Sequence, residues 1–187
     1  MPLKDMIRQK VHTRNISVAT YSIDDDQVLV EGTLQDDRLV EYYLISSRDR
    51  RPPGVIHQMT LRILVEAPEF IIRDIEVDMP GIPREECSET GSMMESIRGL
   101  SIAPGFTNRV KKLLGGSRGC AHLVNLLLAM APAAVQGFWT HKAQKPLSVE
   151  DFNMREKMSR FLINTCWVWR EDGTLVKDLK NRLAGSD

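Results

Sequence analysis

Apolar and polar side chains alternate along parts of the first half of the chain, and this alternation restricts the fold more than any other feature. Over residues 61–65, leucine, isoleucine and valine occupy every second position. Over residues 71–79, Asp74, Glu76 and Asp78 share the face opposite to most of the apolar side chains. Because side chains of a β-strand point alternately to its two faces, each segment is predicted to be a strand, with the three acids on a solvated face. The short link between the two strands favours antiparallel pairing.

Further strands are predicted before this pair, and helices after it. The other strands are expected at residues 16–23, 28–34 and 39–45. The helices are expected at residues 83–97, 106–114, 120–136 and 148–162. Pro132 should kink or end the third helix, because proline removes a backbone donor and clashes with the preceding turn. A short strand at 166–169 and a short helix after Gly173 complete the prediction.

The order of these elements, strands first and helices second, indicates an α+β fold. We expect an N-terminal antiparallel β-sheet packed against C-terminal helices. A length of 187 residues fits one domain with a sizeable core. Within this domain, 1–187, the strand-rich part is 12–80, the helix-rich part is 83–163, and a short strand and tail occupy 164–187.

The balance of charge argues against two classes of partner. Lys and Arg total 25, as do Asp and Glu, so the formal net charge is zero. A chain without an overall positive field is not expected to bind nucleic acid or an anionic membrane. The most apolar stretch, 123–135, contains Asn125 and Pro132 and is too short to span a bilayer. Since the N-terminus also lacks the apolar core of a secretory signal, we expect a soluble cytoplasmic protein.

The segment 115–123, Gly-Gly-Ser-Arg-Gly-Cys-Ala-His-Leu, carries the strongest chemical signal. A helix is predicted to begin at or near Cys120, and the N–H groups at a helix N-terminus favour the thiolate, which is the nucleophilic and metal-binding form. Positions i and i+2 of a helix diverge, so Cys120 and His122 can share a partner only if Cys120 lies on the non-helical cap. The alternative interpretation is a small buried cysteine, a surface histidine and a glycine turn.

Other thiols and imidazoles could join this segment. His57 opens the strand that includes 61–65, and Cys87 lies near the start of the helix predicted at 83–97. Cys166 is interpreted as a core cysteine and as a reserve ligand, because free cysteine is among the most buried residue types. In a reducing compartment, three widely spaced cysteines are more often buried, metal-bound or catalytic than disulfide-bonded.

Several motifs resemble those of the bacterial family known as domain of unknown function 2889. Its signature is similar to Ile102-Ala-Pro-Gly-Phe106, Gly119-Cys-Ala-His-Leu123 and a helix that ends in Gln136. Further matches are Val11-His-Thr-Arg14, Ile56-His-Gln-Met59 with Leu61-Arg62, the spacing from Pro83 to Cys87, and Asn164-Thr-Cys166. The resemblance extends from about His12 to Trp169. It strengthens the location of the site and implies no particular reaction.

Three positions depart from the family pattern. Ala121 stands where the family usually has Thr, Gln58 where it has Asp, and Trp167 where it has His. Each change removes a polar or ligating group. The order of elements also resembles, by analogy alone, the scaffold proteins of iron–sulfur cluster assembly, which implies cluster or zinc ligands at His57, Cys87, Cys120 and His122.

Three hypotheses for function follow. The first is a metal-binding domain for zinc or iron, with His57, Cys87, Cys120 and His122 as ligands. The second is a metal-free thiol enzyme, in which Cys120 is the nucleophile, His122 or His57 its base, and an acid such as Asp74 orients the base. The third is a non-catalytic binding or oligomerisation module. A small-molecule substrate and self-association are open, and the type of reaction is not predicted.

Overall fold

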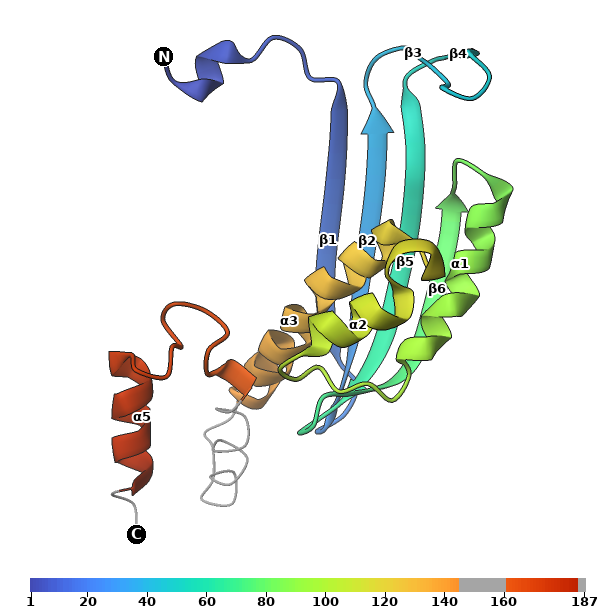
Figure 1. The fold of residues 1–187 in the computed structure, drawn as a ribbon. Coiled ribbons are helices and arrows are strands. Elements are labelled where there is room, and N and C mark those ends of the chain that lie inside the picture. Colours follow the sequence, from blue (N-terminus) through green and yellow to red (C-terminus); the bar gives the residue numbers. More distant parts are fainter. Residues whose placement is uncertain (145–160, 185–187) are drawn as a thin grey trace.

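A four-stranded antiparallel sheet forms the centre of the computed structural model, which describes residues 1–144 and 161–184 (Figure 1). Its strands lie in the order β1-β2-β5-β6, and each is antiparallel to its neighbours. They are β1 (His12–Ser22), β2 (Gln27–Arg38), β5 (Gly54–Glu66) and β6 (Ile71–Gly81). A hairpin of two short strands, β3 (Tyr42–Tyr43) and β4 (Arg50–Arg51), connects β2 to β5. The predicted antiparallel sheet is therefore confirmed.

Helices follow the sheet in sequence, and those of residues 89–142 cover one of its faces (Figure 1). A 3₁₀ turn, η1 (Leu3–Met6), precedes the sheet. After it come η2 (Glu85–Ser88), α1 (Glu89–Met93), η3 (Met94–Ile97), α2 (Phe106–Leu114), η4 (Gly116–Arg118), α3 (Ala121–Lys142) and α5 (Thr174–Ala184). The segment predicted as one helix at 83–97 is thus a succession of α and 3₁₀ turns. With the sheet, these helices confirm the α+β class.

The long helix α3 packs closely across β1 and β2, and this contact explains why it does not end at Pro132. A Cβ atom on Gly137 would lie 2.3 Å from Cγ2 of Thr20, and one on Gly32 would lie 2.6 Å from Sδ of Met130. The hydroxyl of Thr20 also donates to the carbonyl oxygen of Ala133, at 3.0 Å. Packing on the sheet therefore outweighs the cost of an internal proline, and the helix continues ten residues beyond it, to Lys142.

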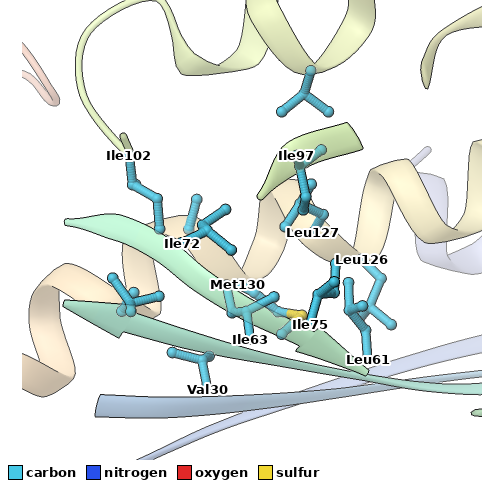
Figure 2. Close-up of a cluster of buried hydrophobic side chains, with 14 of the residues drawn as sticks. Val30, Leu61, Ile63, Ile72, Ile75, Ile97, Ile102, Leu126, Leu127 and Met130 are labelled. Atoms are coloured by element: carbon cyan, nitrogen blue, oxygen red, sulfur yellow. The ribbon is translucent and has the colours of Figure 1, made fainter. Parts of the chain in front are cut away.

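The core lies between the sheet and α3 (Figure 2). Alternate residues of β2 and β5 are fully or almost fully buried: Val28, Val30, Leu34, Met59, Leu61, Ile63 and Val65. The residues of α3 that meet them are Leu123, Leu126, Leu127, Met130 and Phe138. Helix α3 is long and apolar enough to cross a membrane by length and composition alone, but half of its apolar window is buried inside the protein. The buried half belongs to the core between α3 and the sheet.

Two predicted strands differ from the structure. Only Tyr42–Tyr43 of the segment 39–45 is a strand. The strand predicted at 166–169 is wrong, since these residues form bends and a turn. The segment lies beside α2 and α3 rather than along an edge of the sheet, so none of the described strands is there to accept its backbone hydrogen bonds. Cys166 is consequently exposed and is not a core cysteine.

The remaining predictions concern the end of the chain. The final short helix after Gly173 is confirmed as α5. The helix predicted at 148–162 falls mostly outside the described residues; its last two positions, 161–162, are helical.

Candidate metal centre

A buried carboxylate, Asp36, lies at the centre of the candidate site. The buried face of β2 runs through every second residue, and Asp36 occupies the next position of that face after Leu34. Its side chain is 2% exposed, and Asp36 is the one buried polar or charged residue in the part of the chain that the structure describes. Because burying a charge is costly without partners, the groups around Asp36 must compensate it.

The neighbouring strands supply two of these partners. In the register of the sheet, Arg14 of β1 and His57 of β5 lie directly opposite Asp36, one on each side. Arg14 donates from Nε to Oδ1 at 2.6 Å and from Nη2 to Oδ2 at 2.7 Å, a bidentate ion pair. Nδ1 of His57 lies 3.0 Å from Oδ2. The bonds from Arg14 are the main reason why the pKa of Asp36 is lowered, against the effect of burial, so this carboxylate is held ionised.

The first turn of α3 brings the third partner, and a tight connection from α2 fixes where that turn begins. Gly116 has a positive φ of 65°, and a Cβ on Gly119 would lie 2.8 Å from the carbonyl oxygen of Leu114. Glycine is therefore required where the chain turns back on α2. Helix α3 starts directly after this turn, with Cys120 as an extended N-cap residue.

His122 then projects from α3 over the sheet. Its Nε2 lies 3.5 Å from Oδ2 of Asp36, and its ring centroid is 3.9 Å from that of His57, with the two rings tilted by 30°. Burial is the main cause of a lowered pKa of His122, and the nearby His57 and Arg14 act in the same direction. His122 is therefore a neutral imidazole near pH 7, the form that binds a metal.

Cys120 lies on the other side of the same imidazole. Its Sγ is 3.6 Å from Nδ1 of His122, the nitrogen that faces away from Asp36. The extended conformation of Cys120 makes this contact feasible, as the sequence analysis required of a cysteine on the cap. His12, on β1, also approaches the carboxylate, with Nε2 3.7 Å from Oδ1 of Asp36.

One atom each from Asp36, His57 and His122 lie within 4.8 Å of one another, close enough to hold one metal ion. In a tetrahedral zinc site with bonds of about 2.0–2.1 Å, the ligand atoms are separated by about 3.3 Å. The separations from Oδ2 of Asp36, 3.0 Å to Nδ1 of His57 and 3.5 Å to Nε2 of His122, are near that value. Two imidazoles and one carboxylate suit zinc or ferrous iron and leave positions for water or a substrate.

The structure unites some of the residues that the sequence singled out and separates others. His57 and His122 lie together, and Cys120 contacts His122. Among the described residues, the three-residue metal group contains neither Cys120 nor Cys87. Cys87 lies on η2 after β6, where its N–H donates to the carbonyl oxygen of Arg84 and its carbonyl oxygen accepts from the Thr90 hydroxyl and the Glu89 N–H. Cys166 lines a separate cleft between α2 and α3.

The carboxylate of Asp36 and its cation, Arg14, were not among the residues predicted from the sequence. Asp74, the acid that the sequence analysis proposed, is 59% exposed and forms an ion pair with Arg98 at 2.7 Å. Together with Glu76 and Asp78 it belongs to the solvated face that was expected. A signal for Asp36 does exist, because it continues the period-two burial of 28–34 by one step. A carboxylate in a buried register needs a partner from a neighbouring strand, and Arg14 is such a partner.

The chain is thus an α+β protein with a histidine–carboxylate cluster between a sheet and a helix N-terminus. The chain belongs to the family described as Protein of unknown function (DUF2889), whose model matches residues 12–136. This match confirms the predicted resemblance over residues 12–136 and includes every residue of the cluster, whereas the motif Asn164-Thr-Cys166 lies beyond the matched residues. The likeness to iron–sulfur scaffold proteins is not supported by any comparison. No curated protein and no solved structure matches the chain.

Proposed function

We propose that this protein binds one divalent metal ion, zinc or ferrous iron, through Asp36, His57 and His122. The observation that carries the proposal is the convergence of two imidazole nitrogens on a single oxygen of a buried carboxylate. Of the four ligands expected from the sequence, His57 and His122 are kept. Asp36 takes the place of the other two, Cys87 and Cys120. Cys120 instead contacts Nδ1 of His122, the ring nitrogen that remains when Nε2 binds the metal.

Second contacts support the proposed ligands. A ligating imidazole usually has a partner at its other nitrogen, which fixes the ring, and Cys120 provides one for His122. Arg14 fixes the carboxylate of Asp36 through two bonds. A carboxylate oxygen has two lone pairs, so Oδ2 can accept from Arg14 and still bind a metal. The guanidinium also repels a cation, and we expect weaker metal binding than at a similar site without an arginine.

Metal titration of chelator-treated, untagged protein tests this proposal. We expect one equivalent of Zn²⁺, or of Fe²⁺ under anaerobic conditions, to bind the wild type. His57→Gln and His122→Gln should each weaken binding at least tenfold, since each removes a ligand. His141→Gln is the matched control, because His141 lies on the same helix outside the cluster. Equal binding by all four proteins would contradict the proposal.

A second candidate function rests on a different chain of contacts in the same site. Sγ of Cys120, Nδ1 of His122, Nε2 of His122 and Oδ2 of Asp36 follow one another at 3.6 Å and 3.5 Å. This is the order of nucleophile, base and orienting acid in a thiol enzyme. His122 would take the thiol proton as the sulfur bonds to an electrophilic carbon, and would pass it to the leaving group. Asp36 fills the role that the sequence analysis gave to Asp74.

Alkylation kinetics distinguish this candidate from the metal site. In metal-free protein near neutral pH, a thiol nucleophile at Cys120 should react with iodoacetamide faster than the exposed Cys166. His122→Gln should abolish that advantage without changing the rate at Cys166. If Cys120 reacts no faster than Cys166 in the wild type, the thiol mechanism is excluded.

We further propose that the protein works in the cytoplasm, where its thiols stay reduced, and that nucleic acid and membranes are not its partners.

A further inference from the structure

Figure 1 shows the end of the sheet where β2 leads into the β3–β4 hairpin. A second pocket lies there. Its volume is about 410 Å³, and it is lined by Arg38, Tyr43, Leu44, Ile45, Ser46 and Arg84. Two of these six side chains are guanidinium groups and none is an acid. The pocket therefore combines a positive charge with an apolar wall.

Neither arginine has an acidic partner among the described residues. Arg38 is half-buried, and its guanidinium carbon lies 3.8 Å from the ring centroid of Tyr42. Arg84 precedes η2 and uses no side-chain donor within the described part of the chain. Glu41, an acid of the same hairpin, is paired with Arg50. A guanidinium has five donors in a fixed fork, and those of Arg38 and Arg84 that no described protein group accepts are available to an oxyanion in this pocket.

The hairpin adds exposed apolar side chains to this charge. Tyr43 is 67% exposed and the side chain of Ile45 is fully exposed, although both belong to the lining of the pocket. Large apolar side chains held in water beside two arginines suit a ligand with one apolar part and one anionic group. Guanidinium groups bind the planar carboxylate and the phosphate group in the same bidentate manner.

The register of the sheet places this pocket at the same end as the metal centre. Arg38 pairs with His12, which approaches Asp36 at 3.7 Å. On the other side, Gln58 follows His57 and pairs with Gly81, three residues before Arg84. Both arginines thus come from segments that leave the sheet just beyond the centre.

We propose that Arg38 and Arg84 bind the oxyanion of a small amphiphilic ligand, a carboxylate or a phosphate monoester, with Tyr43 and Ile45 covering its apolar part. Metal is not needed for this binding, because no residue of the pocket belongs to the metal centre. The ligand would be held beside the centre, where a substrate would have to lie.

Calorimetric titration of the chelator-treated, full-length protein at low ionic strength tests the proposal with three probes of similar size. Phenyl phosphate and benzoate carry the two oxyanions, and benzyl alcohol is the uncharged control. We expect at least one anion to bind and benzyl alcohol to bind at least tenfold more weakly. The tighter of the two anions identifies the preferred group. Failure of both anions to bind, or equal binding of the alcohol, would overturn the proposal and leave the metal titration unaffected.

Variants then locate the binding site. Arg84→Gln should weaken the anion at least tenfold, because one charge-assisted pair of bonds is lost. Arg84→Lys keeps the positive charge but cannot donate two parallel bonds. Its affinity for the anion should therefore lie between those of the wild type and Arg84→Gln. Arg170→Gln is the control. Arg170 lies over the ring of Trp167, as Arg38 lies over the ring of Tyr42, but it is outside the pocket. Arg38→Gln provides a second test of the same pocket. Because Arg84 is exposed, we expect its replacement to leave the fold intact. Unchanged affinity in Arg84→Gln and Arg38→Gln would refute the assignment.

Discussion

Replacement of Asp36 by asparagine should lower the free energy of unfolding of the metal-free protein. The size of the loss can be worked out from the contacts of Asp36. The side chain keeps its shape but loses its charge and one acceptor oxygen. In the wild type the carboxylate accepts two bonds from Arg14, at 2.6 Å and 2.7 Å, and lies 3.0 Å from His57. A hydrogen bond to a charged group contributes about 1.5–3 kcal/mol, and removing one partner of a fully buried ion pair costs about 3–5 kcal/mol.

The exposure of Arg14 reduces this cost. Its side chain is 36% exposed, whereas that of Asp36 is 2% exposed, so water can solvate part of the abandoned guanidinium. We therefore expect Asp36→Asn to lower the free energy of unfolding by roughly 2 kcal/mol. For a chain of this size the midpoint of thermal unfolding should fall by about 4–8 °C. The loss should exceed any surface change, which is usually within about 0.5 kcal/mol.

Urea denaturation at pH 7.5 with a chelator present, followed by circular dichroism, measures the effect. Asp37→Asn is the matched control, because Asp37 is the next residue, on the opposite face, and its described bonds are to Gln35. In the double variant Arg14→Gln/Asp36→Asn, the loss should be smaller than the sum of the two single losses. A loss in Asp36→Asn no greater than in Asp37→Asn, or strictly additive losses, would refute the view that this ion pair stabilises the fold.

Acid should remove the difference between the wild type and Asp36→Asn. The pKa of Asp36 is lowered in the folded protein, mainly by Arg14, so the unfolded state binds more protons as the pH falls. The stabilisation is therefore present above the ordinary pKa of 3.8 and is lost as the pH falls through the lowered value.

Three further predictions concern the same architecture. Arg14→Gln should bind Zn²⁺ about tenfold more tightly in a competition titration. The reason is that a divalent ion about 5 Å from a guanidinium is repelled by roughly 1–2 kcal/mol even at the dielectric constant of water. Unchanged or weaker binding would contradict this prediction. The pKa of His122 lies below its ordinary value of 6.5, so the unfolded state binds the extra proton and the stability of metal-free protein should rise with pH up to about that value; His122→Gln should flatten this dependence in denaturation curves. Gly137→Ala should cost about 1–3 kcal/mol, because its Cβ would meet Thr20 at 2.3 Å, whereas Gly54→Ala, with nothing within 4 Å, should be nearly neutral by thermal unfolding.

The fold could be predicted from local patterns because its strands and helices are segregated along the chain. Alternation identified β5 and β6, and apolar content identified α3. The end of α3 could not be predicted, since Pro132 opposes the helix locally and the close packing on the sheet, at Gly32 and Thr20 among others, supports it. The strand predicted at 166–169 failed for the converse reason: strand-forming residues form no strand without a neighbouring edge.

The site was predicted in part. The Gly-Cys-Ala-His segment and His57 lie where the chemistry of a helix N-terminus and a strand end suggested. Asp36 was missed because its partners, Arg14 and His57, are 22 and 21 residues away and meet it only through the register of three strands. Cys87 was predicted as a ligand because it lies near the start of a predicted helix. In the structure it lies on η2 and has no described contact with His57 or His122.

X-ray absorption at the zinc edge of protein loaded with one equivalent of Zn²⁺ tests the metal centre most directly. Three protein ligands from Asp36, His57 and His122 should give a first shell of nitrogen and oxygen alone, at about 2.0–2.2 Å. The same spectrum should be obtained from Cys120→Ser. A sulfur shell at about 2.3 Å that disappears in Cys120→Ser would contradict the carboxylate-centred site and restore the thiolate ligand expected from the sequence.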